Sequence, residues 1–343
     1  MGSRPTIQQL AEAAGVSVAT VDRVLNGRLK VREETARKVY DAARAIRYHG
    51  SELIRHRMQA ELPAMTLGFL FQKRRQPFYQ AFADEARKAV ENCGRVRGTA
   101  AIEFTDEPST EAVLDKLSDL AKKADAIAFV SPDHHSITTM VRDLRGQGKP
   151  VFSLLSDFVQ GVRNHYIGLD NIKVGRTAAW FISKTAQRPG KVALFVGGFR
   201  WHGHELRETG FRSFFREYAP EFDVLDTYVN LDTRAVTEEA ARGLLHRQPD
   251  LVGLYVAGGG MEGAIKAIRE STQDLPPSVV VNELTADSAA ALQDHLIIAA
   301  ISTPLAKLSG RVVDMMVDAK LEEREGTSGQ LFLPFDLHVP ESL

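Results

Sequence analysis

The chain has 343 residues, of which 44% are hydrophobic and 25% charged, and a single cysteine. This composition excludes a disordered or collagen-like chain and an internal disulfide framework, and the length predicts two or three folding units. No apolar run is long enough to cross a bilayer and the N-terminus carries no signal segment, so we expect a cytoplasmic protein with no membrane partner. Residues 1–60 hold 11 Lys/Arg and 6 Asp/Glu, a net charge of +5, which leaves −6 for the rest because the whole chain carries −1. This asymmetry indicates a polyanionic partner for the first segment alone.

The basic N-terminal segment shows the pattern of three short helices. Thr6 and Gln9 form a capping-box pair, and apolar residues then recur at helical spacing up to Gly15, which tolerates a left-handed helix end. After a very short turn, Ser17 is placed to cap a second helix, and a third is expected over residues 33–47. The pattern predicts a helix-turn-helix. A three-helix bundle with no DNA role is the alternative, and the basic charge favours DNA.

The stretch T-I-x-x-L-A-x-x-A-G-V-S-x-x-T-V-D-R-V-L-N that starts at Thr6 resembles the head of the lactose-repressor (LacI) family without a gap. In that family the second helix lies in the major groove. The resemblance implies that Val18, Ala19 and Arg23 face base edges, and the guanidinium of Arg23 suits guanine O6 and N7. The resemblance also implies contacts with the DNA phosphates, which position the head on the duplex but do not distinguish base sequences. These contacts would come from Ser17, Thr20, Asn26 and the helix start at Thr6.

The connector, residues 51–62, departs from the family, whose hinge helix wedges a leucine into the minor groove. Here Arg57 holds the wedge position. Either Met58 or Leu53 replaces the leucine, or Arg57 lies in the narrow groove as a cation, or the connector is a solvated linker with no groove contact. A second departure is Arg32, which stands where the family places a capping serine before the third helix.

From residue 63 onward, short apolar runs alternate with amphipathic helices, which predicts an α/β fold with parallel sheets. So many strands suggest two sheets and two lobes, with a ligand cleft beyond the carboxyl ends of the strands. The expected strands are residues 67–71, 101–104, 126–130, 151–155, 166–169, 192–196, 223–228, 251–256, 279–281 and 299–301. The expected helices are residues 78–92, 109–123, 172–186, 206–218, 235–247, 260–271 and 306–319.

Four short motifs in this second part resemble, in order, segments of the family's periplasmic-binding-protein-like domain: QPFY at 76–79, IGLDN at 167–171, RETGF at 207–211 and VNELT at 281–285. The resemblance implies a DNA-binding head (1–50), a connector (51–62) and an effector-binding and dimerisation domain (63–343). It also implies chain crossovers near residues 164, 293 and 323. These would make an N-lobe of 63–164 and 293–323 and a C-lobe of 165–292 and 324–343.

Residues at the strand ends are the candidates for the cleft. By resemblance, Phe78 and Tyr79 are walls that stack on a sugar ring, and the planar fork of Arg207 binds vicinal hydroxyls or a carboxylate. Each has a structural alternative, which is core packing for the aromatic residues and a surface ion pair for the arginine. The further candidates are Asp133, Asp157, Asn282, Glu283 and Thr303.

Nothing in the sequence indicates catalysis, a metal or a cofactor. Gly258, Gly259 and Gly260 are not followed by the Gly-Lys-Ser/Thr of a phosphate loop, and no Gly-x-Ser-x-Gly elbow occurs. His202 and His204 lack a third ligand. We therefore expect no enzyme, no cofactor and no metal.

The function predicted from the sequence is that of a transcription regulator, expected to be a repressor. It would bind a pseudo-palindromic double-stranded DNA operator as a homodimer or higher oligomer, and respond to a small effector. A sugar, a polyol and a sugar acid all fit. The alternatives are a sugar-processing enzyme with an accessory bundle, which the lack of a catalytic set opposes, and a solute-binding protein, which the specific head opposes.

Overall fold

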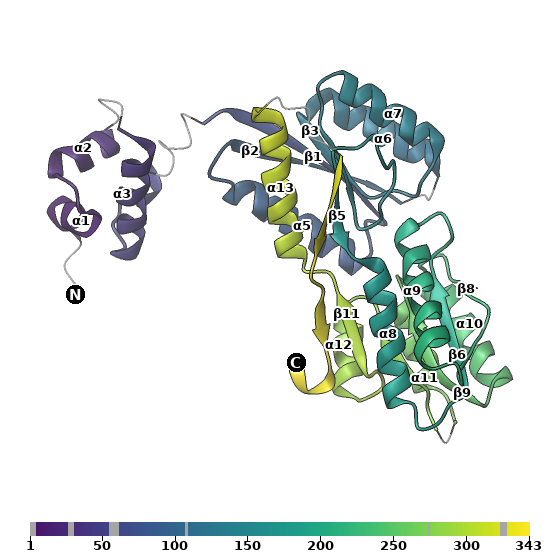
Figure 1. The fold of residues 1–343 in the computed structure, drawn as a ribbon. Coiled ribbons are helices and arrows are strands. Elements are labelled where there is room, and N and C mark those ends of the chain that lie inside the picture. Colours follow the sequence, from purple (N-terminus) through teal and green to yellow (C-terminus); the bar gives the residue numbers. More distant parts are fainter. Residues whose placement is uncertain (1–4, 27–30, 55–61, 107–108, 274, 323–327) are drawn as a thin grey trace. The chain divides into compact units, whose positions relative to one another are not determined.

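The computed structural model describes residues 5–26, 31–54, 62–106, 109–273, 275–322 and 328–343. They form two compact units, one containing the N-terminal head and the other most of the remaining chain, here called the body (Figure 1). Within these ranges, no helix combines the length and apolar character needed to cross a membrane.

The head consists of three short helices: α1 (Ile7–Ala14), α2 (Val18–Asn26) and α3 (Glu33–Ala45). Their apolar faces meet in a small core in which Leu10, Val21 and Val39 are fully buried. Arg32 makes no side-chain cap at the start of α3, so the departure from the family pattern leaves that helix uncapped by a side chain. Residues 51–54 form a further helical turn.

The ends of α1 and α2 confirm the local signals in the sequence. Thr6 and Gln9 make the full capping box, and Gly15 ends α1 with φ of 63°. The hydroxyl of Ser17 accepts the Thr20 N–H at 3.2 Å and so caps α2. The turn between the two helices is therefore held by the backbone N–H groups of Gly15 and Val16, which donate to the end of α1, and by the Ser17 hydroxyl at the start of α2.

The N-lobe of the body is a six-stranded sheet. Its order is β12 (Gly329–Leu333), β5 (His165–Leu169), β4 (Val151–Leu154), β3 (Ala126–Phe129), β1 (Ala64–Gln72) and β2 (Arg97–Thr105), and the pairs from β12 to β1 are parallel. Its helices are α5 (Pro77–Asn92), α6 (Thr110–Lys123), α7 (His135–Gly146) and α13 (Leu305–Leu321).

Both faces of this sheet are covered because successive strand residues point to opposite sides. In β1, Leu70 packs with the α6 and α7 side chains in one core cluster. The next residue, Phe71, packs instead against Phe82 of α5, with ring centroids 4.6 Å apart. The near-continuous apolar sequence of β1 follows from this double coverage.

The C-lobe is a seven-stranded sheet. Its order is β13 (Asp336–His338), β11 (Ala299–Ser302), β10 (Ser278–Val281), β9 (Leu251–Val256), β6 (Lys191–Val196) and β7 (Asp223–Val224), with β8 (Tyr228–Val229) also pairing with β6. Only the β11–β13 pair among those described is antiparallel. One face carries α8 (Asn171–Thr185) and α9 (His202–Tyr218), and the other carries α10 (Arg234–Arg247), α11 (Met261–Arg269) and α12 (Ala286–Gln293).

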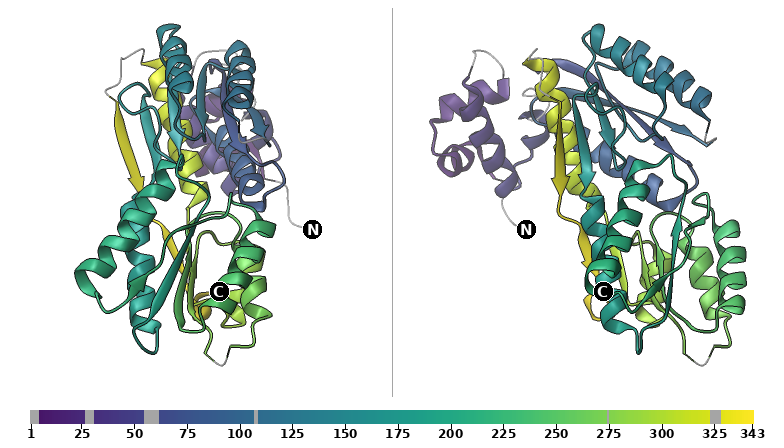
Figure 2. Two further views of the ribbon diagram at one scale, coloured as in Figure 1. Left: turned by 90° about the vertical axis from the view of Figure 1, so that its right-hand side faces the viewer. Right: turned by 45° about the vertical axis from the view of Figure 1, so that its right-hand side comes forward.

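The chain passes between the lobes three times, after β5, after β11 and after β12. Figures 1 and 2 show β12, coloured yellow, beside β5 although their sequence positions are far apart. The lobe boundaries expected near 164 and 293 need correction, because β5 pairs with β4 and β12 in the N-lobe and β11 pairs with β10 in the C-lobe. The boundary expected near 323 lies just outside the described residues, and the last crossing comes between β12 and β13. The strand expected over 223–228 is also two short strands, β7 and β8.

Candidate functional site

The head presents one helix face to its surroundings. Val21 and Val24 of α2 are buried in the head core, which turns Val18, Ala19 and Arg23 outward. Val18 is 42% exposed, a large value for an apolar side chain. The side chains that the resemblance assigns to base edges are therefore accessible on the surface of the head.

The residues assigned to phosphates also lie at the head surface. Thr6, Ser17 and Asn26 are exposed, and Thr20 is partly buried. The Asn26 amide donates to the Asp22 carboxylate at 2.6 Å, which orients it along the helix. Arg57 and Met58 lie outside the described residues, whereas Leu53, the other wedge candidate, is 48% exposed.

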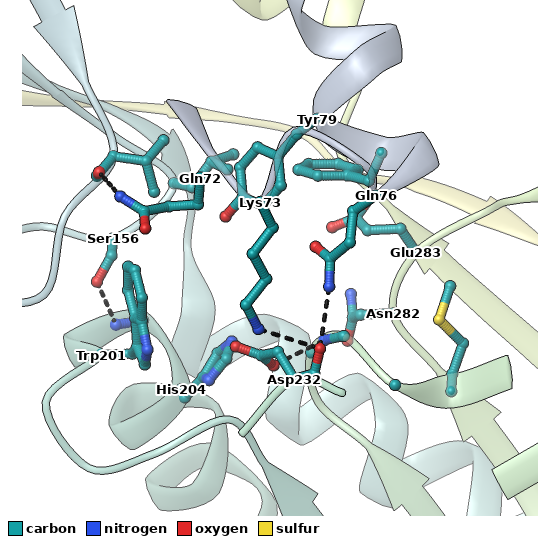
Figure 3. Close-up of a pocket in the computed structure, with 18 of the residues that line it drawn as sticks. Gln72, Lys73, Gln76, Tyr79, Ser156, Trp201, His204, Asp232, Asn282 and Glu283 are labelled. Atoms are coloured by element: carbon teal, nitrogen blue, oxygen red, sulfur yellow. Dashed lines mark hydrogen bonds between the residues drawn. The ribbon is translucent and has the colours of Figure 1, made fainter. Parts of the chain in front are cut away.

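A cavity of about 110 Å³ lies between the lobes of the body. It is lined by residues that follow β1, β3 and β4 of the N-lobe and β6, β8, β9 and β10 of the C-lobe. Because the carboxyl ends of parallel strands meet at one edge of a sheet, the two sheets bring short, distant segments together here. Figure 3 shows the side chains that these segments direct into the space.

Arg207 of α9 is fixed by bonds that leave part of its guanidinium available. Its Nε donates to Asn171 Oδ1 at 2.8 Å, and its Nη1 donates to the Ala257 carbonyl. Among the described residues, Nη2 has no further hydrogen-bond partner, and Arg207 lines the cavity while only 7% exposed. A buried, oriented guanidinium with free N–H groups is a strong hydrogen-bond donor to a ligand.

Glu283 follows β10 and faces the same space. Both of its carboxylate oxygens accept from Thr303, one from the hydroxyl at 2.9 Å and one from the backbone N–H. Burial raises the pKa of the Glu283 carboxyl, and the nearby charge of Arg207 opposes that rise. Thr303 thus orients the Glu283 carboxylate, which lines the cavity. Thr303 itself does not line it.

Asp232 and His204 form a second polar group in the C-lobe wall. Asp232 Oδ1 accepts the Gly259 N–H at 2.8 Å, and His204 Nδ1 accepts the Gly197 N–H at 3.1 Å. An accepting Nδ1 requires the neutral ring with its proton on Nε2, and burial accordingly lowers the His204 pKa. A Cβ at Gly258 would lie 2.6 Å from the histidine ring and 2.7 Å from the aspartate, so glycine is required there.

The N-lobe wall combines aromatic and long polar side chains from one segment after β1. Phe78 and Tyr79 meet edge to face with centroids 5.2 Å apart. Lys73 and Gln76 extend across the cavity toward Asp232 (Figure 3). Trp201 adds an aromatic surface from the C-lobe.

The structure brings five of the eight predicted effector residues to this cavity: Phe78, Tyr79, Arg207, Asn282 and Glu283. The Asn282 amide is largely occupied, since its oxygen accepts from the Tyr255 hydroxyl at 2.6 Å and its nitrogen donates to the Ile301 carbonyl at 2.7 Å. Asn282 is therefore part of the wall and holds β9, β10 and β11 together.

Asp133, Asp157 and Thr303 do not line the cavity, and their predicted placement is corrected. Asp133 is exposed, and its backbone N–H donates to the Arg200 carbonyl at 3.1 Å. Asp157 is 4% exposed and makes a two-pronged ion pair with Arg163, at 2.6 and 2.8 Å.

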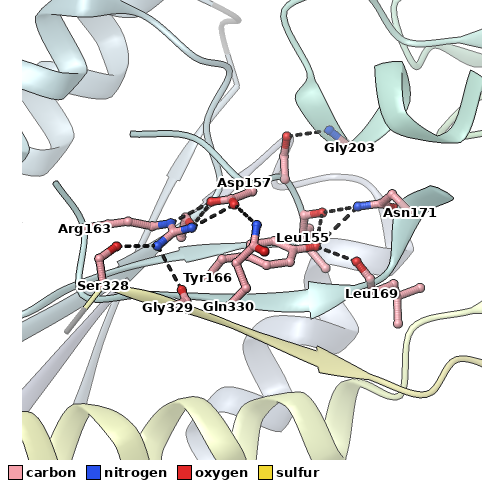
Figure 4. Close-up of polar contacts among 12 residues, drawn as sticks. Leu155, Asp157, Arg163, Tyr166, Leu169, Asn171, Gly203, Ser328, Gly329 and Gln330 are labelled. Carbon is pink, nitrogen blue, oxygen red and sulfur yellow. Dashed lines mark hydrogen bonds and ion pairs between the residues drawn. The ribbon is translucent and has the colours of Figure 1, made fainter. Parts of the chain in front are cut away.

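The Asp157–Arg163 pair belongs to a network that anchors β12 (Figure 4). Gln330 donates to Asp157 at 2.6 Å, and Arg163 Nη1 donates to the Ser328 hydroxyl at 3.1 Å and the Gly329 carbonyl at 2.9 Å. The carboxylate is thus committed to tying the returning strand to the N-lobe and is not available to a ligand.

Sequence reasoning missed Lys73, Gln76 and Asp232. The first two follow β1 directly, and the strand-end rule that selected Phe78 and Tyr79 would have found them. Asp232 follows β8, which the sequence pattern did not separate from β7. Within the described ranges, no group of three or more His, Cys, Asp and Glu side chains is arranged to hold a metal.

The head and the body each match a known protein family. Residues 6–51 match the bacterial regulatory proteins of the lacI family, and residues 67–324 match the periplasmic binding protein domain. An uncharacterized HTH-type transcriptional regulator in the aml 5' region of Streptomyces limosus is 25% identical over 283 residues, covering 81% of this chain and 77% of that protein. The ribose import binding protein RbsB of Bacillus subtilis is 23% identical over 261 residues, covering 74% of this chain and 82% of that protein.

Solved structures show the same fold for the body. An ABC transporter solute binding protein from Burkholderia graminis, in complex with D-arabinose, superposes with a TM-score of 0.73 at 18% identity, covering 81% of this chain and 96% of that one. A periplasmic solute binding protein from Actinobacillus succinogenes with bound D-allose gives a TM-score of 0.73 at 15% identity, covering 81% and 98%. The chain therefore belongs to the LacI family of bacterial regulatory proteins, a family of DNA-binding transcription regulators and not of enzymes, and joins a helix-turn-helix head to a periplasmic binding protein domain.

Proposed function

We propose that this regulator is a cytoplasmic repressor whose affinity for a pseudo-palindromic operator is set by a small neutral sugar or polyol bound between the lobes. The observation that supports it most is the make-up of the cavity, where aromatic rings and polar side chains from both lobes face one small space. A ligand that contacts both walls favours one lobe arrangement over the other, which is what an effector must do.

The charges around the cavity favour a neutral ligand. Two cationic groups, Lys73 and Arg207, face three carboxyl groups, Asp232, Glu262 and Glu283. Burial raises the pKa of both glutamates because it removes water from their charged form, and a ligand carboxylate in the same space would lose hydration in the same way. A sugar acid would bring a further carboxylate into this group, whereas a neutral polyol brings only hydroxyls that donate and accept.

The aromatic side chains complement such a ligand. Phe78, Tyr79 and Trp201 offer apolar surface for the C–H face of a ring, and Arg207 offers N–H groups to neighbouring hydroxyls. RbsB is named a ribose import binding protein, and two of the proteins that share the fold hold D-arabinose and D-allose. These names support a sugar-like effector for this chain.

The operator side of the proposal depends on α2. Its exposed Val18, Ala19 and Arg23 are suited to apolar contact with a thymine methyl and to a bidentate contact with guanine. A homodimer would present two such helices to two half-sites, which is why the operator is expected to be a pseudo-palindrome.

A thermal-shift screen tests the effector assignment on the full chain. The panel pairs neutral monosaccharides and polyols with the matching sugar acids, because a ligand that binds the folded state raises its stability by mass action. We expect a neutral member to raise Tm and its acid to do so much less. The hit is then titrated into a complex with operator DNA selected from a random pool. Stabilisation by the acids alone, or a neutral hit that leaves DNA affinity unchanged, would contradict the proposal.

A further inference from the structure

Hydrogen bonds link the two walls of the cleft directly. Lys73, which follows β1 of the N-lobe, donates from Nζ to the main-chain carbonyls of Leu231 at 2.7 Å and Asp232 at 3.1 Å in the C-lobe. Gln76 donates from Nε2 to the same Asp232 carbonyl at 2.9 Å (Figure 3). Donors and acceptors all belong to the chain, so these bonds need no ligand to complete them.

The backbone at both ends of this contact is held in a disfavoured conformation. Lys73 has φ of 40°, Leu231 of 55° and Asp232 of 51°, although none is glycine. Non-glycine residues adopt the left-handed region only where surrounding structure imposes it, and they cluster at ligand clamps and switch regions. Leu231 is also 59% exposed, so burial of its side chain does not explain its conformation.

The acceptor loop in the C-lobe is held by hydrogen bonds within its own lobe. Asn230, which is fully buried, accepts the Asp232 N–H at 2.9 Å and donates to the Gly259 carbonyl at 2.9 Å. The Asp232 carboxylate accepts the Gly259 N–H. These bonds fix the carbonyls of residues 231 and 232 in front of the cavity, where a single side chain from the other lobe reaches both.

The donor is suited to this position. The Lys73 ammonium is partly buried, and burial lowers its pKa while the charge of Asp232 opposes that shift. A partly desolvated ammonium gains more from two carbonyl oxygens than it would in water, because it has lost part of its hydration. Opening the cleft breaks both bonds and returns the ammonium and the carbonyls to water.

We propose that Lys73 is a latch that closes the two lobes independently of the effector, and so sets how much further stabilisation the effector must supply. This proposal concerns the regulation of the effector site. It rests on the proposed function, in which the effector binds in the cleft. With the latch in place, the closed arrangement is populated before the effector binds, which strengthens apparent affinity for any ligand that selects it.

The test measures the distance between the lobes with no ligand added. Spin labels are placed on exposed positions of α7 and α10, using Thr139→Cys and Glu239→Cys in a Cys93→Ser background. We expect one short-distance population for this protein and a longer one for Lys73→Met. The loss of a charged donor with two acceptors should shift the open-to-closed ratio by about tenfold or more. Arg75→Met, an exposed residue of the same loop, is the matched control and should leave the distances unchanged.

Two more variants guard against a folding defect. Lys73→Arg keeps a cationic donor and should remain mostly closed, and Gln76→Leu removes the neutral donor and should open the cleft less than Lys73→Met does. Identical distributions for Lys73→Met and the unmodified chain would overturn the latch, as would opening by Arg75→Met to the same extent. Because no ligand is used, either result leaves the effector assignment to be judged by the thermal-shift screen.

Discussion

In the head, most of the described side chains assigned to DNA are exposed, whereas in the body the polar side chains of the cleft are buried or partly buried and bonded together. Val18 is 42% exposed on α2, while Arg207 and Asn282, which line the cavity, are 7% and 1% exposed. An exposed side chain can change at little cost to folding, but a buried polar group leaves its partners unsatisfied when it is removed. The two regions should therefore respond differently to single substitutions.

The largest effect on folding is expected for Arg163→Met, which leaves the buried Asp157 carboxylate without its main partner. Breaking a buried ion pair from one side costs about 3–5 kcal/mol, to be measured by urea unfolding of the body. Arg269→Met is the control, since its pair with Asp294 is about half exposed and such pairs contribute less than about 1 kcal/mol. Equal midpoints for the two variants would show that the network in Figure 4 is not critical to stability.

Arg207→Ala should come next and act mainly on the effector, with a smaller loss of stability because Asn171 and the Ala257 carbonyl lose a donor. Removing a buried charged donor from a ligand site costs about 2–5 kcal/mol of affinity, so the response of the operator complex to the screened effector should be lost while operator binding persists. Arg212→Ala, on the same helix and bonded to Glu208, is the control. If Arg207→Ala titrates like the unmodified chain, the guanidinium does not contact the effector. If operator binding is lost as well, Arg207→Lys keeps the charge without the planar fork and repeats the test.

A smaller effect, confined to the head, is expected for Arg23→Ala. Loss of a bidentate base contact costs about 1–3 kcal/mol and relaxes the preference at one base pair. Operator variants changed at single positions are compared by fluorescence anisotropy, with the folding midpoint unchanged. Asn26→Ala, assigned to a phosphate, should weaken binding to all variants alike. A uniform loss for Arg23→Ala would assign that side chain to the phosphate backbone instead.

The smallest expected effect is that of Thr6→Ala, which removes the helix cap of α1. Such caps contribute about 1 kcal/mol, which corresponds to about fivefold faster exchange of the amides that the head core protects. Hydrogen exchange at Leu10 and Ala11 in the full chain measures it. Gln8→Ala, an exposed neighbour outside the capping box, should leave exchange unchanged, and equal acceleration in both variants would rule out the cap as the cause.

The same contrast explains what the sequence predicted well. The helices of the head follow from signals within a few residues, such as the pair Thr6 and Gln9 and the left-handed end at Gly15, and these were confirmed. In the body, the family resemblance assigned Phe78 and Arg207 to the cleft, and both line the cavity, where the carboxyl ends of the parallel strands meet.

What the sequence did not predict depends on partners distant along the chain or across a loop. Strand β12 forms because Gly329 to Leu333 pair with His165 to Leu169. A local sequence pattern does not predict this pairing. In the sequence, Asp157 resembles a ligand residue. In the structure, the loop after it, in which Val159 has φ of 56°, brings Arg163 back to pair with its carboxylate. Lys73 and Asp232 meet only after two sheets have formed.

The late strands β12 and β13 also bear on how the protein is made. Gly329–Leu333 forms the edge of the N-lobe sheet and Asp336–His338 the edge of the C-lobe sheet, within a stretch of a few residues. A growing chain that has reached only residue 322 would present the edges of β5 and β11 uncovered, and unpaired edges invite association with other chains. Both edges are covered only when this one late segment pairs, so the two lobes depend on the same few residues to close their sheets.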